Sequence, residues 1–363
     1  MIIDEIFLSD WRNIAEIKFQ PDDAINIFLG ENAQGKTNIL EAINFASLLR
    51  SRAKRETELI RWGQNAALVR IKFSKEGVSH LLAIEVSADR RRRIFLDANP
   101  IRPRELLGKL NSVLFSPEDL FMFKGTSSTR RKFLDAQISQ ASPIYFLDLS
   151  KYTRLVEIRN ALLKKIRDDD APETELDLWD EQLAITAEKV ISKRLTAVNK
   201  LNALANSMQQ KISSQRENLF VAYEMRVLDT DENIADGFLE ALRARRLKDV
   251  QHGSTSFGPH LDDLKFLINE RELRTFGSQG QLRTSALALK LSELQFIKSE
   301  TGEYPLLLLD DVMSELDATR RELLLDFLRR EKIQTLITAT DRAYFPQQSF
   351  GKFFSVAAGR LIE

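Results

Sequence analysis

The chain contains no cysteine and only three histidines among its 363 residues. Without thiols it can form no disulfide bridge, thiolate zinc site or cysteine nucleophile, and a cytoplasmic setting is expected. His80, His252 and His260 lie too far apart for a metalloprotease-type zinc motif. Oxygen ligands are therefore the metal chemistry that the sequence favours.

An excess of one charge is also lacking. Lys and Arg number 53, Asp and Glu number 53, and the formal net charge is zero. This excludes a strongly basic domain, the simplest indication of nucleic-acid binding, but not local basic clusters. No apolar run approaches the ~20 residues of a membrane span, and the amino terminus lacks the features of a signal peptide. We expect an intracellular protein without a membrane partner.

The pattern of apolar residues predicts the domain organisation. Hydrophobic residues make up 43% of the chain, enough for two domains or for one large domain with an insertion. Strand and helix patterns alternate at both ends of the chain, and helical periodicity dominates its middle. We expect an α/β head with a mixed sheet in residues 1–125 and 251–363, interrupted by a mainly helical arm in residues 126–250.

The arm contains a helical stripe from about residue 174 to residue 215. One uninterrupted helix over this stretch would reach about 60 Å and would suit a projecting helical hairpin. A break near Asn206 and Ser207 would instead give an ordinary helical subdomain. The sequence favours neither.

The most specific pattern follows an apolar strand candidate, residues 24–29, and precedes a helix candidate. It fits the phosphate-binding pattern G-x-x-x-x-G-K-T. Small residues let backbone N–H groups turn toward an anion at the positive end of the following helix. Lys36 is expected to reach the β- and γ-phosphates, and Thr37 to ligate Mg²⁺. The loop comprises Gly30, Glu31, Asn32, Ala33, Gln34, Gly35, Lys36 and Thr37.

A phosphate loop needs an acidic partner on a neighbouring strand. A four-leucine run, residues 306–309, ends in Asp310 and Asp311. Asp310 is placed to hold the Mg²⁺ shell, and Asp311 to orient or activate water. Leucine-rich strands often end in acidic turns, so the two aspartates alone are weak evidence of a metal site. The phosphate loop in the same chain makes the assignment stronger. Together the two patterns predict binding of ATP and Mg²⁺, which kinases and GTPases of the P-loop class could share.

A third segment distinguishes an ABC-type ATPase from a P-loop kinase or GTPase. Ser278, Gln279, Gly280 and Gln281 resemble the signature motif of ABC-type ATPases, and residues 314–317 resemble the D-loop of that class. The order of the four motifs is that of the class. A serine hydroxyl and backbone amides at a helix start suit a γ-phosphate.

Longer stretches resemble the RecF family of bacterial recombinational DNA-repair ATPases, and they are residues 30–42, 115–120, 130–135, 258–263, 278–283 and 309–317. The resemblance implies an ABC-type P-loop ATPase head, SMC-like, with a helical arm. It implies a homodimer that forms on ATP, with two ATPs between the protomers, and ATP-dependent binding of gapped DNA at single/double-strand junctions. It also implies work with RecR and RecO to load RecA in recombinational repair and replication restart.

The resemblance extends the predicted ATP site beyond the phosphate loop. Arg12, Asn13 and Asn38 are expected beside the nucleotide, and Ser278, Gly280 and Gln281 would close the site from the other protomer. Lys36, Asp311 and Ser278 would act in catalysis. Glu118 lies at the Q-loop position of the class, where it could sense Mg²⁺ or merely cap the next helix.

Two departures from ABC transporters predict slow hydrolysis. Asp311 stands where the general base is usually glutamate, and it is one methylene shorter. Thr340 stands at the switch-loop position, which is usually histidine, and a hydroxyl cannot act as an imidazole does. We therefore expect a slow, DNA-dependent ATPase that times release from DNA.

Three basic clusters are candidate DNA contacts, since phosphate neutralisation by Lys and Arg supports binding. Each could equally be a solvated face with acidic neighbours such as Glu56 and Glu58. The clusters comprise Arg50, Arg52, Lys54 and Arg55; residues 90–93, including Arg91; and Arg130, Arg131 and Lys132.

Some alternatives stay open. His260, Asp262 and Asp263 could form a metal or catalytic trio, although a hydrogen-bonded turn around Gly258 and Pro259 is favoured. The other classes that fit are another SMC-like repair ATPase, an ABC transporter ATPase subunit, a toxin-defence ATPase of the overcoming-lysogenisation type, and a non-enzymatic scaffold that binds ATP.

Overall fold

The computed structural model describes residues 1–89, 92–225, 233–345 and 351–362. The chain divides into two compact units. The first, here called the head unit, comprises residues 1–121, 211–214 and 282–363. The second, the arm unit, comprises residues 122–210 and 215–281, and so continues past residue 250, where the arm was expected to end.

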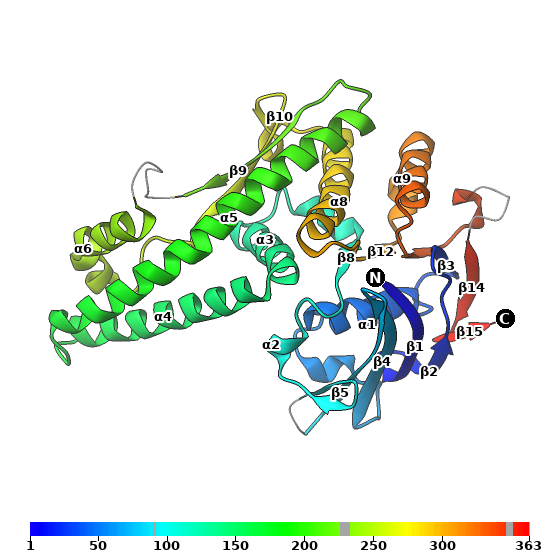
Figure 1. The fold of residues 1–363 in the computed structure, drawn as a ribbon, viewed down its shortest axis with the longest axis horizontal. Coiled ribbons are helices and arrows are strands. Elements are labelled where there is room, and N and C mark those ends of the chain that lie inside the picture. Colours follow the sequence, from blue (N-terminus) through cyan, green and yellow to red (C-terminus); the bar gives the residue numbers. More distant parts are fainter. Residues whose placement is uncertain (90–91, 226–232, 346–350, 363) are drawn as a thin grey trace. The chain divides into compact units, whose positions relative to one another are not determined.

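The head unit contains two six-stranded sheets (Figure 1). In the first, five neighbouring strands run parallel and only the edge strand β15 is antiparallel. Its order is β15 (Arg360–Ile362), β14 (Lys352–Ala357), β3 (Ile25–Leu29), β13 (Thr335–Ala339), β12 (Leu306–Asp310) and β8 (Ser112–Phe115). The second sheet is antiparallel, in the order β2 (Ile14–Phe19), β1 (Ile2–Trp11), β4 (Ala66–Lys75), β5 (Val78–Ser87), β6 (Arg93–Leu96) and β7 (Asn99–Pro100).

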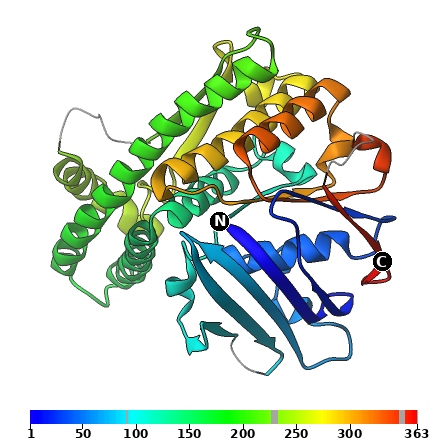
Figure 2. The ribbon, with the colours of Figure 1, turned by 45° about the vertical axis from the view of Figure 1, so that its right-hand side comes forward.

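The burial of the strands follows from their sequence. Every residue of β12 is buried, as expected for a parallel strand that is covered on both faces. β4 alternates between buried and accessible residues, as expected for an antiparallel strand with one face toward the core. Helix α1 (Lys36–Leu48) contacts strands of both sheets, and Figure 2 shows it alongside the antiparallel strands. The main core therefore surrounds the helix that begins at the phosphate loop.

No helix in the described ranges is long and apolar enough to cross a membrane.

Apart from α1, the head unit contains two longer α-helices, α8 and α9, and several short helical segments in its described residues. The α-helices are α2 (Pro103–Leu106), α8 (Gln279–Thr301), whose first residues belong to the arm unit, and α9 (Ala318–Glu331). The 3-10 helices are η1 (Glu56–Leu59), η2 (Pro117–Phe121), η4 (Val312–Glu315) and η5 (Arg342–Tyr344).

The arm unit combines long helices with a small sheet. A three-stranded sheet has the order β11-β10-β9, and β9, which the helical periodicity did not predict, pairs with β10 from beyond residue 250. This pairing explains why the unit extends further than expected. The elements are α3 (Ser127–Ala141), α4 (Pro143–Arg167), η3 (Glu173–Glu175), α5 (Leu176–Ile212), β9 (Leu219–Glu224), α6 (Ile234–His252), β10 (Asp263–Ile268), β11 (Arg271–Glu272) and α7 (Leu273–Phe276).

Helix α5 is continuous through Asn206, so the long-helix alternative holds. The asparagine side chains of α5 serve the neighbouring strand instead of ending the helix. Asn202 Oδ1 accepts a hydrogen bond from the Val221 N–H at 2.8 Å, and Asn206 Oδ1 accepts one from the Leu219 N–H at 3.1 Å. The apparent break signal is thus the attachment of β9 to the helix.

Buried charges join the helices of the arm unit. Arg159 is fully buried, and it donates hydrogen bonds to Asp180 and Asp249 at 2.7 Å each. Arg194, on α5, donates to both carboxylate oxygens of Asp135, on α3, at 3.0 Å each. Because a buried ion is costly without a partner, these pairs fix which helix faces meet.

The segment Gly258–Asp263 is a hydrogen-bonded turn, as the favoured alternative stated. Tyr152 donates to His260 Nδ1 at 2.6 Å, and Asp262 accepts from Tyr223 at 2.7 Å. The backbone N–H of Leu261 closes the turn onto the Gly258 carbonyl at 2.7 Å. No group of three or more acidic or histidine side chains in the described ranges is arranged to hold a metal. The trio therefore has a structural explanation.

Replacing Arg159 tests the buried charge network. In Arg159→Met the carboxylates of Asp180 and Asp249 lose a buried partner, which should reduce the free energy of unfolding by about 3–5 kcal/mol. The matched control is Arg154→Met on the same helix, because Arg154 is 72% exposed in its pair with Glu157 and should change stability by under about 0.5 kcal/mol. Urea unfolding followed by circular dichroism measures both, and equal effects would contradict the assignment.

His260 should make stability depend on pH. Burial, with Arg131 and Arg194 nearby, lowers the pKa of His260 from 6.5 to about 4. The unfolded chain then binds the proton more tightly, so stability is full above pH 6.5 and falls as the pH drops toward 4. The loss should be roughly 3 kcal/mol, at about 1.4 kcal/mol per pKa unit. Chemical denaturation of His260→Asn between pH 7 and 4 should show a flatter profile, and a profile parallel to that of the parent would contradict this.

Candidate ATP-binding site

The phosphate loop is shaped by two glycines that no other residue could replace without strain. Gly35 has a φ of 107°, in the left-handed region, and a Cβ there would lie 2.8 Å from Asn13 Oδ1. A Cβ on Gly30 would lie 2.3 Å from the Val356 carbonyl oxygen of β14. The loop therefore leaves the end of β3 in close contact with its neighbours and enters α1 at Lys36.

The carboxy-terminal hairpin holds the loop from the side. The N–H of Gly359 donates to the Gln34 carbonyl at 2.9 Å, and the N–H of Ala358 donates to Gln34 Oε1 at 2.7 Å. On the other side, Asn38 Nδ2 donates to Asn13 Oδ1 at 2.8 Å. Asn13, Gln34 and Asn38 thus act on the loop conformation, a role that motif matching alone did not reveal.

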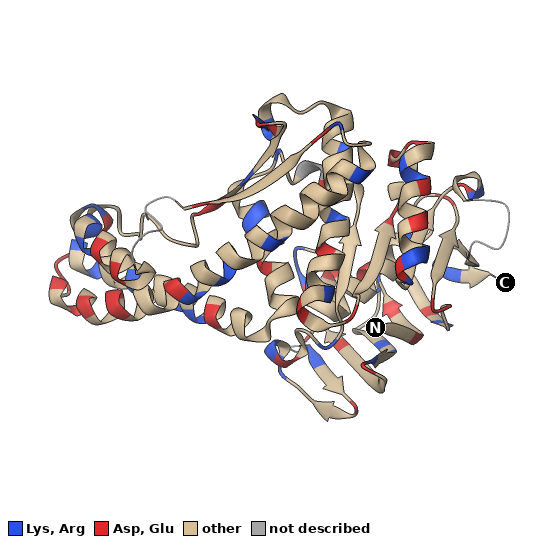
Figure 3. Cartoon of the chain, turned by 45° about the horizontal axis from the view of Figure 1, so that its top comes forward, with Lys and Arg blue, Asp and Glu red and all other residues tan. Residues whose placement is uncertain are grey.

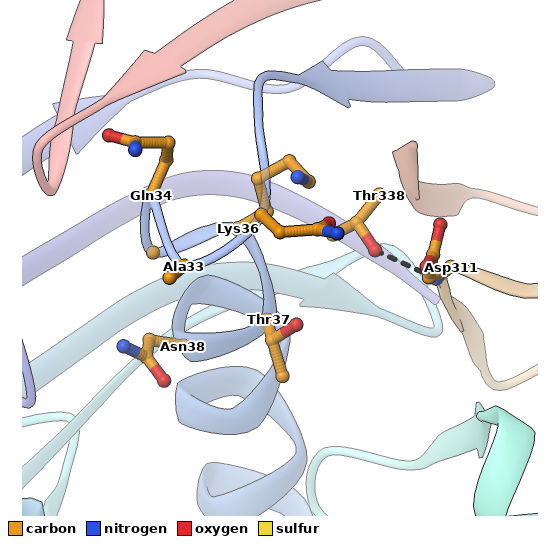
Figure 4. A pocket seen from close by; sticks show the side chains of 9 residues that line it. Ala33, Gln34, Lys36, Thr37, Asn38, Asp311 and Thr338 are labelled. Atoms are coloured by element: carbon orange, nitrogen blue, oxygen red, sulfur yellow. Dashed lines mark hydrogen bonds between the residues drawn. The ribbon is translucent and has the colours of Figure 1, made fainter. Parts of the chain in front are cut away.

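The loop forms one wall of a pocket that is partly open to solvent. Figure 4 shows Lys36 and Thr37 at the loop, with Asp311 and Thr338 across from them. The pocket wall combines the start of α1 with the ends of β12 and β13. Its lining residues are Asn32, Ala33, Gln34, Gly35, Lys36, Thr37, Asn38, Asp311 and Thr338.

Lys36 places a positive charge beside this pocket. Its ammonium donates to the carbonyl oxygens of Gly30 at 2.6 Å and Glu31 at 2.7 Å. Burial lowers the pKa of Lys36, and the carboxylates of Asp311 and Asp310 oppose that shift. An ammonium group has three N–H donors, so this arrangement is suited to a phosphate oxygen.

Two oxygen donors meet where parallel strands end. Thr37 Oγ1 donates to Asp310 Oδ1 at 2.7 Å, although the two residues are far apart in sequence. Strand β13 lies between β3 and β12, so their carboxyl ends reach the same edge of the sheet. Thr338 of β13 donates to the same Asp310 oxygen at 3.0 Å. A hydroxyl and a carboxylate in contact are a donor set suited to Mg²⁺.

Asp311 is held in an unusual conformation at the pocket wall. Its φ is 55°, in the left-handed region, and its N–H donates to Thr338 Oγ1 at 2.9 Å (Figure 4). Its Oδ1 is buried without a hydrogen-bond partner among the described residues. Burial raises the pKa of Asp311 above its ordinary value. The ammonium of Lys36 opposes this shift, and the carboxylate of Asp310 adds to it. An unsatisfied carboxylate oxygen on the wall fits a site that takes a cation or a water.

The structure places Arg52 at this site and not on a free basic surface. Its Nη1 lies 3.2 Å from Asp310 Oδ2, and its Nε lies 3.3 Å from Glu118 Oε2. A guanidinium favours such carboxylate partners, and the expected contact of Arg52 with DNA stays a prediction. Through Arg52, Glu118 is connected to Asp310 while its own side chain stays exposed.

A buried charge cluster fixes the segment that carries Glu118. Asp119 accepts hydrogen bonds from the Ser116 N–H at 2.7 Å, and it pairs with Lys290 of α8 at 3.0 Å. Lys290 also lies 3.4 Å from Glu293, and burial raises the pKa of Glu293 to about 7. Sequence reasoning missed this cluster because its members are distant in the chain.

Arg12 supports α1 and does not line the pocket described above. Its Nε and Nη2 donate to the two carboxylate oxygens of Glu41 at 2.8 and 2.7 Å. Its Nη1 donates to the Glu58 carbonyl at 3.1 Å. Arg12 thus lies between α1 and η1, and its expected place beside the nucleotide stays a prediction.

The signature-like segment forms the start of α8. Ser278 Oγ accepts a hydrogen bond from the Gln281 N–H at 3.2 Å, and Gln281 Oε1 accepts one from the Ser278 N–H at 3.0 Å. This reciprocal pair is a capping box. Ser278 and Gly280 are exposed, so the motif presents a hydroxyl and a helix start at the surface.

The predicted basic clusters differ in the burial and ion pairing of their side chains. Arg130 is buried and donates to both oxygens of Asp263 at 2.7 Å, which corrects its assignment as a DNA contact. Arg131 donates to the Asp262 carbonyl at 2.7 Å and is half-buried. Arg90 and Arg91 lie outside the described residues. Figure 3 shows Lys and Arg residues interleaved with Asp and Glu residues along the helices of the described part of the chain.

The loop after α1 keeps the most accessible basic side chains of the first cluster. Arg50, Lys54 and Arg55 are exposed. Lys54 and Arg55 form no ion pair with any residue in the described part of the chain. These three residues, together with the exposed Lys132 of the third cluster, remain candidate DNA contacts.

Comparison with known proteins identifies the fold and the family. The family model "RecF/RecN/SMC N terminal domain" matches residues 2–358. The chain is 42% identical to the DNA replication and repair protein RecF of Halothermothrix orenii, over 94% of this chain and 92% of that protein. It is 41% identical to the protein of the same name from Enterococcus faecalis, over 94% and 92%.

Comparison with solved structures points to the same family. A structure of the recombination mediator protein RecF with ATP superimposes with a TM-score of 0.91 at 34% identity, covering 99% of this chain and 97% of the other. An Smc head bound to the C-winged helix domain of ScpA matches with a TM-score of 0.60 at 15% identity, which concerns the fold alone. The prediction of an ABC-type head with a mixed sheet is confirmed, and the chain belongs to the RecF family of ABC-type ATP-binding proteins.

Proposed function

We propose that this protein binds ATP with Mg²⁺ in the head-unit pocket and uses it to bind and release DNA during repair. The observation that carries the proposal is the contact of Thr37 with Asp310 beside an unsatisfied oxygen of Asp311. Lys36 and the backbone N–H groups of the phosphate loop would bind the phosphates. Thr37 and Asp310 would hold Mg²⁺, which when bound offsets phosphate charge.

Closure of the site would require a second copy of the chain. The capped start of α8 exposes Ser278 and Gly280, which are suited to bind the γ-phosphate of a nucleotide held by a partner. Two such contacts, related by twofold symmetry, would stabilise a dimer as long as the γ-phosphates are present. Gln281 would keep the serine hydroxyl oriented through the capping box.

Hydrolysis would be slow and would end the dimer. Asp311 lines the pocket and would be the carboxylate that orients an attacking water, but its side chain is shorter than that of glutamate. Thr338 restrains the Asp311 backbone, and Thr340 at the end of β13 offers no imidazole. Both features favour a timing role over rapid turnover. Loss of the γ-phosphate would remove the link between protomers.

DNA binding would use the loop that follows α1. Arg50, Lys54 and Arg55 are accessible there and can neutralise phosphates, which makes binding sensitive to salt. Since the net charge is zero, a single chain would bind DNA weakly, and pairing two chains would combine their basic loops. We propose gapped DNA with a single/double-strand junction as the substrate.

The similar solved structures support a proposal about the partner proteins of this chain. A neighbouring structure is described as a recombination mediator in the RecFOR pathway. We propose that this chain likewise acts with RecO and RecR to help load RecA on single-stranded DNA. The alternatives are another SMC-like repair ATPase or an ABC transporter subunit. The extensive identity to RecF proteins disfavours both.

ATP-dependent dimerisation is the direct test. Static light scattering should show a doubling of mass when ATP and Mg²⁺ are added, because the nucleotide would join two half-sites. Ser278→Arg should abolish the gain by blocking the γ-phosphate position without removing the phosphate loop.

The matched control is Ser150→Arg, an exposed serine on α4 that should leave the dimer intact. Binding of a fluorescent ATP analogue should persist in both variants. A parent protein that stays monomeric with ATP, or a Ser278→Arg variant that dimerises as well as the parent, would contradict the proposal.

A further inference from the structure

Trp62 is an apolar side chain that the fold leaves in solvent. It is 97% exposed, whereas no other large hydrophobic side chain in the described part of the chain exceeds 69%. Tryptophan usually buries most of its surface, so this exposed indole is unusual and is available to stack against a ligand. Neither the ATP site nor the core uses this residue.

The loop that carries Trp62 is anchored at both ends. The N–H of Arg61 donates to the Asp10 carbonyl at 2.8 Å, and the N–H of Gln64 closes a turn onto the Arg61 carbonyl at 3.0 Å. On the far side, the Asn65 carbonyl accepts from the Ala88 N–H at 3.0 Å. The indole therefore projects from a fixed turn, which reduces the ordering cost of binding.

The chain segment that carries Trp62 is rich in polar and basic residues. Residues 50–65 contain five basic and two acidic side chains. Glu56 already pairs with Arg92, and Glu58 accepts from the Lys54 backbone N–H at 3.1 Å. Lys54 and Arg55 stay exposed, and η1 separates them from the Trp62 turn by only a few residues.

These neighbours favour a nucleobase over an apolar protein surface. Gly63, Gln64 and Asn65, which follow Trp62, are all exposed, and none adds a large apolar side chain. Amide side chains can bond the edges of bases, and cations can hold the adjoining phosphates. A lone aromatic ring among such groups matches the pattern of single-strand binding, in which bases stack on aromatic side chains.

We propose that Trp62 is a stacking platform for an unpaired base of DNA, with Lys54 and Arg55 holding the neighbouring phosphates. This inference rests on the proposed DNA-binding function and adds a site that selects single-stranded nucleotides. A base inside a duplex is already stacked on its neighbours, so Trp62 would act on the gap and not on the flanking helix.

The test compares two DNA probes by fluorescence anisotropy with ATP and Mg²⁺ present. One is a gapped duplex, and the other is an intact duplex of the same length. Trp62→Ala should weaken binding of the gapped duplex by about 5- to 150-fold, the usual effect of losing one stacked base, and should change intact-duplex binding by less than about twofold. Trp62→Phe should retain most of the affinity.

The control is Phe220→Ala, which removes another exposed aromatic ring, on β9. It should bind both probes as the parent does. Thermal unfolding of Trp62→Ala should match the parent, since the side chain packs on little.

Each contrary result has a distinct meaning. If Trp62→Ala binds gapped DNA as tightly as the parent, the stacking site is refuted while the DNA-binding function stands. Equal losses on both probes, or a loss of affinity for RecO or RecR with DNA binding unchanged, would also refute it. If the parent binds neither probe, the proposed function itself fails.

Discussion

The contact between Thr37 and Asp310 is the constraint on which the site depends. It joins the first turn of α1 to the end of β12, and β13 between them adds Thr338 to the same carboxylate. Parallel strands bring their carboxyl ends to one edge, so residues from opposite ends of the chain meet there. Glycines at both ends of the phosphate loop and the carboxy-terminal hairpin then fix the loop against this edge.

A second set of constraints controls which charges are free. Arg12, Arg52 and Arg130 each have carboxylate partners, and each pairing stabilises a local junction: α1 with η1, the ATP-site carboxylates, and α3 with β10. Arg50, Lys54 and Arg55 stay exposed in the loop after α1, and Trp62 is exposed a few residues further along the chain. A chain of zero net charge can therefore still present basic residues locally.

Local sequence patterns were enough to predict the phosphate loop and the strand that ends at Asp310. These succeed because chain-local steric and hydrophobic rules decide them. The roles of Arg12, Arg52 and Arg130 could not be foreseen, since their partners lie on other elements. Strand β9 was missed for the same reason: its pairing with β10 and its contacts with Asn202 and Asn206 are tertiary.

We propose that the pocket both binds and cleaves ATP, with Asp311 acting on water. Single-turnover hydrolysis, with protein in excess over ATP and with or without gapped DNA, tests it most directly. The parent should cleave ATP more slowly than about 10 s⁻¹, a typical enzyme turnover, and faster with DNA than without. Asp311→Asn should bind ATP without cleaving it, while Asp326→Asn, an exposed carboxylate on α9, should behave as the parent. Unchanged cleavage by Asp311→Asn, or ATP bound by the parent without any cleavage, would contradict the account.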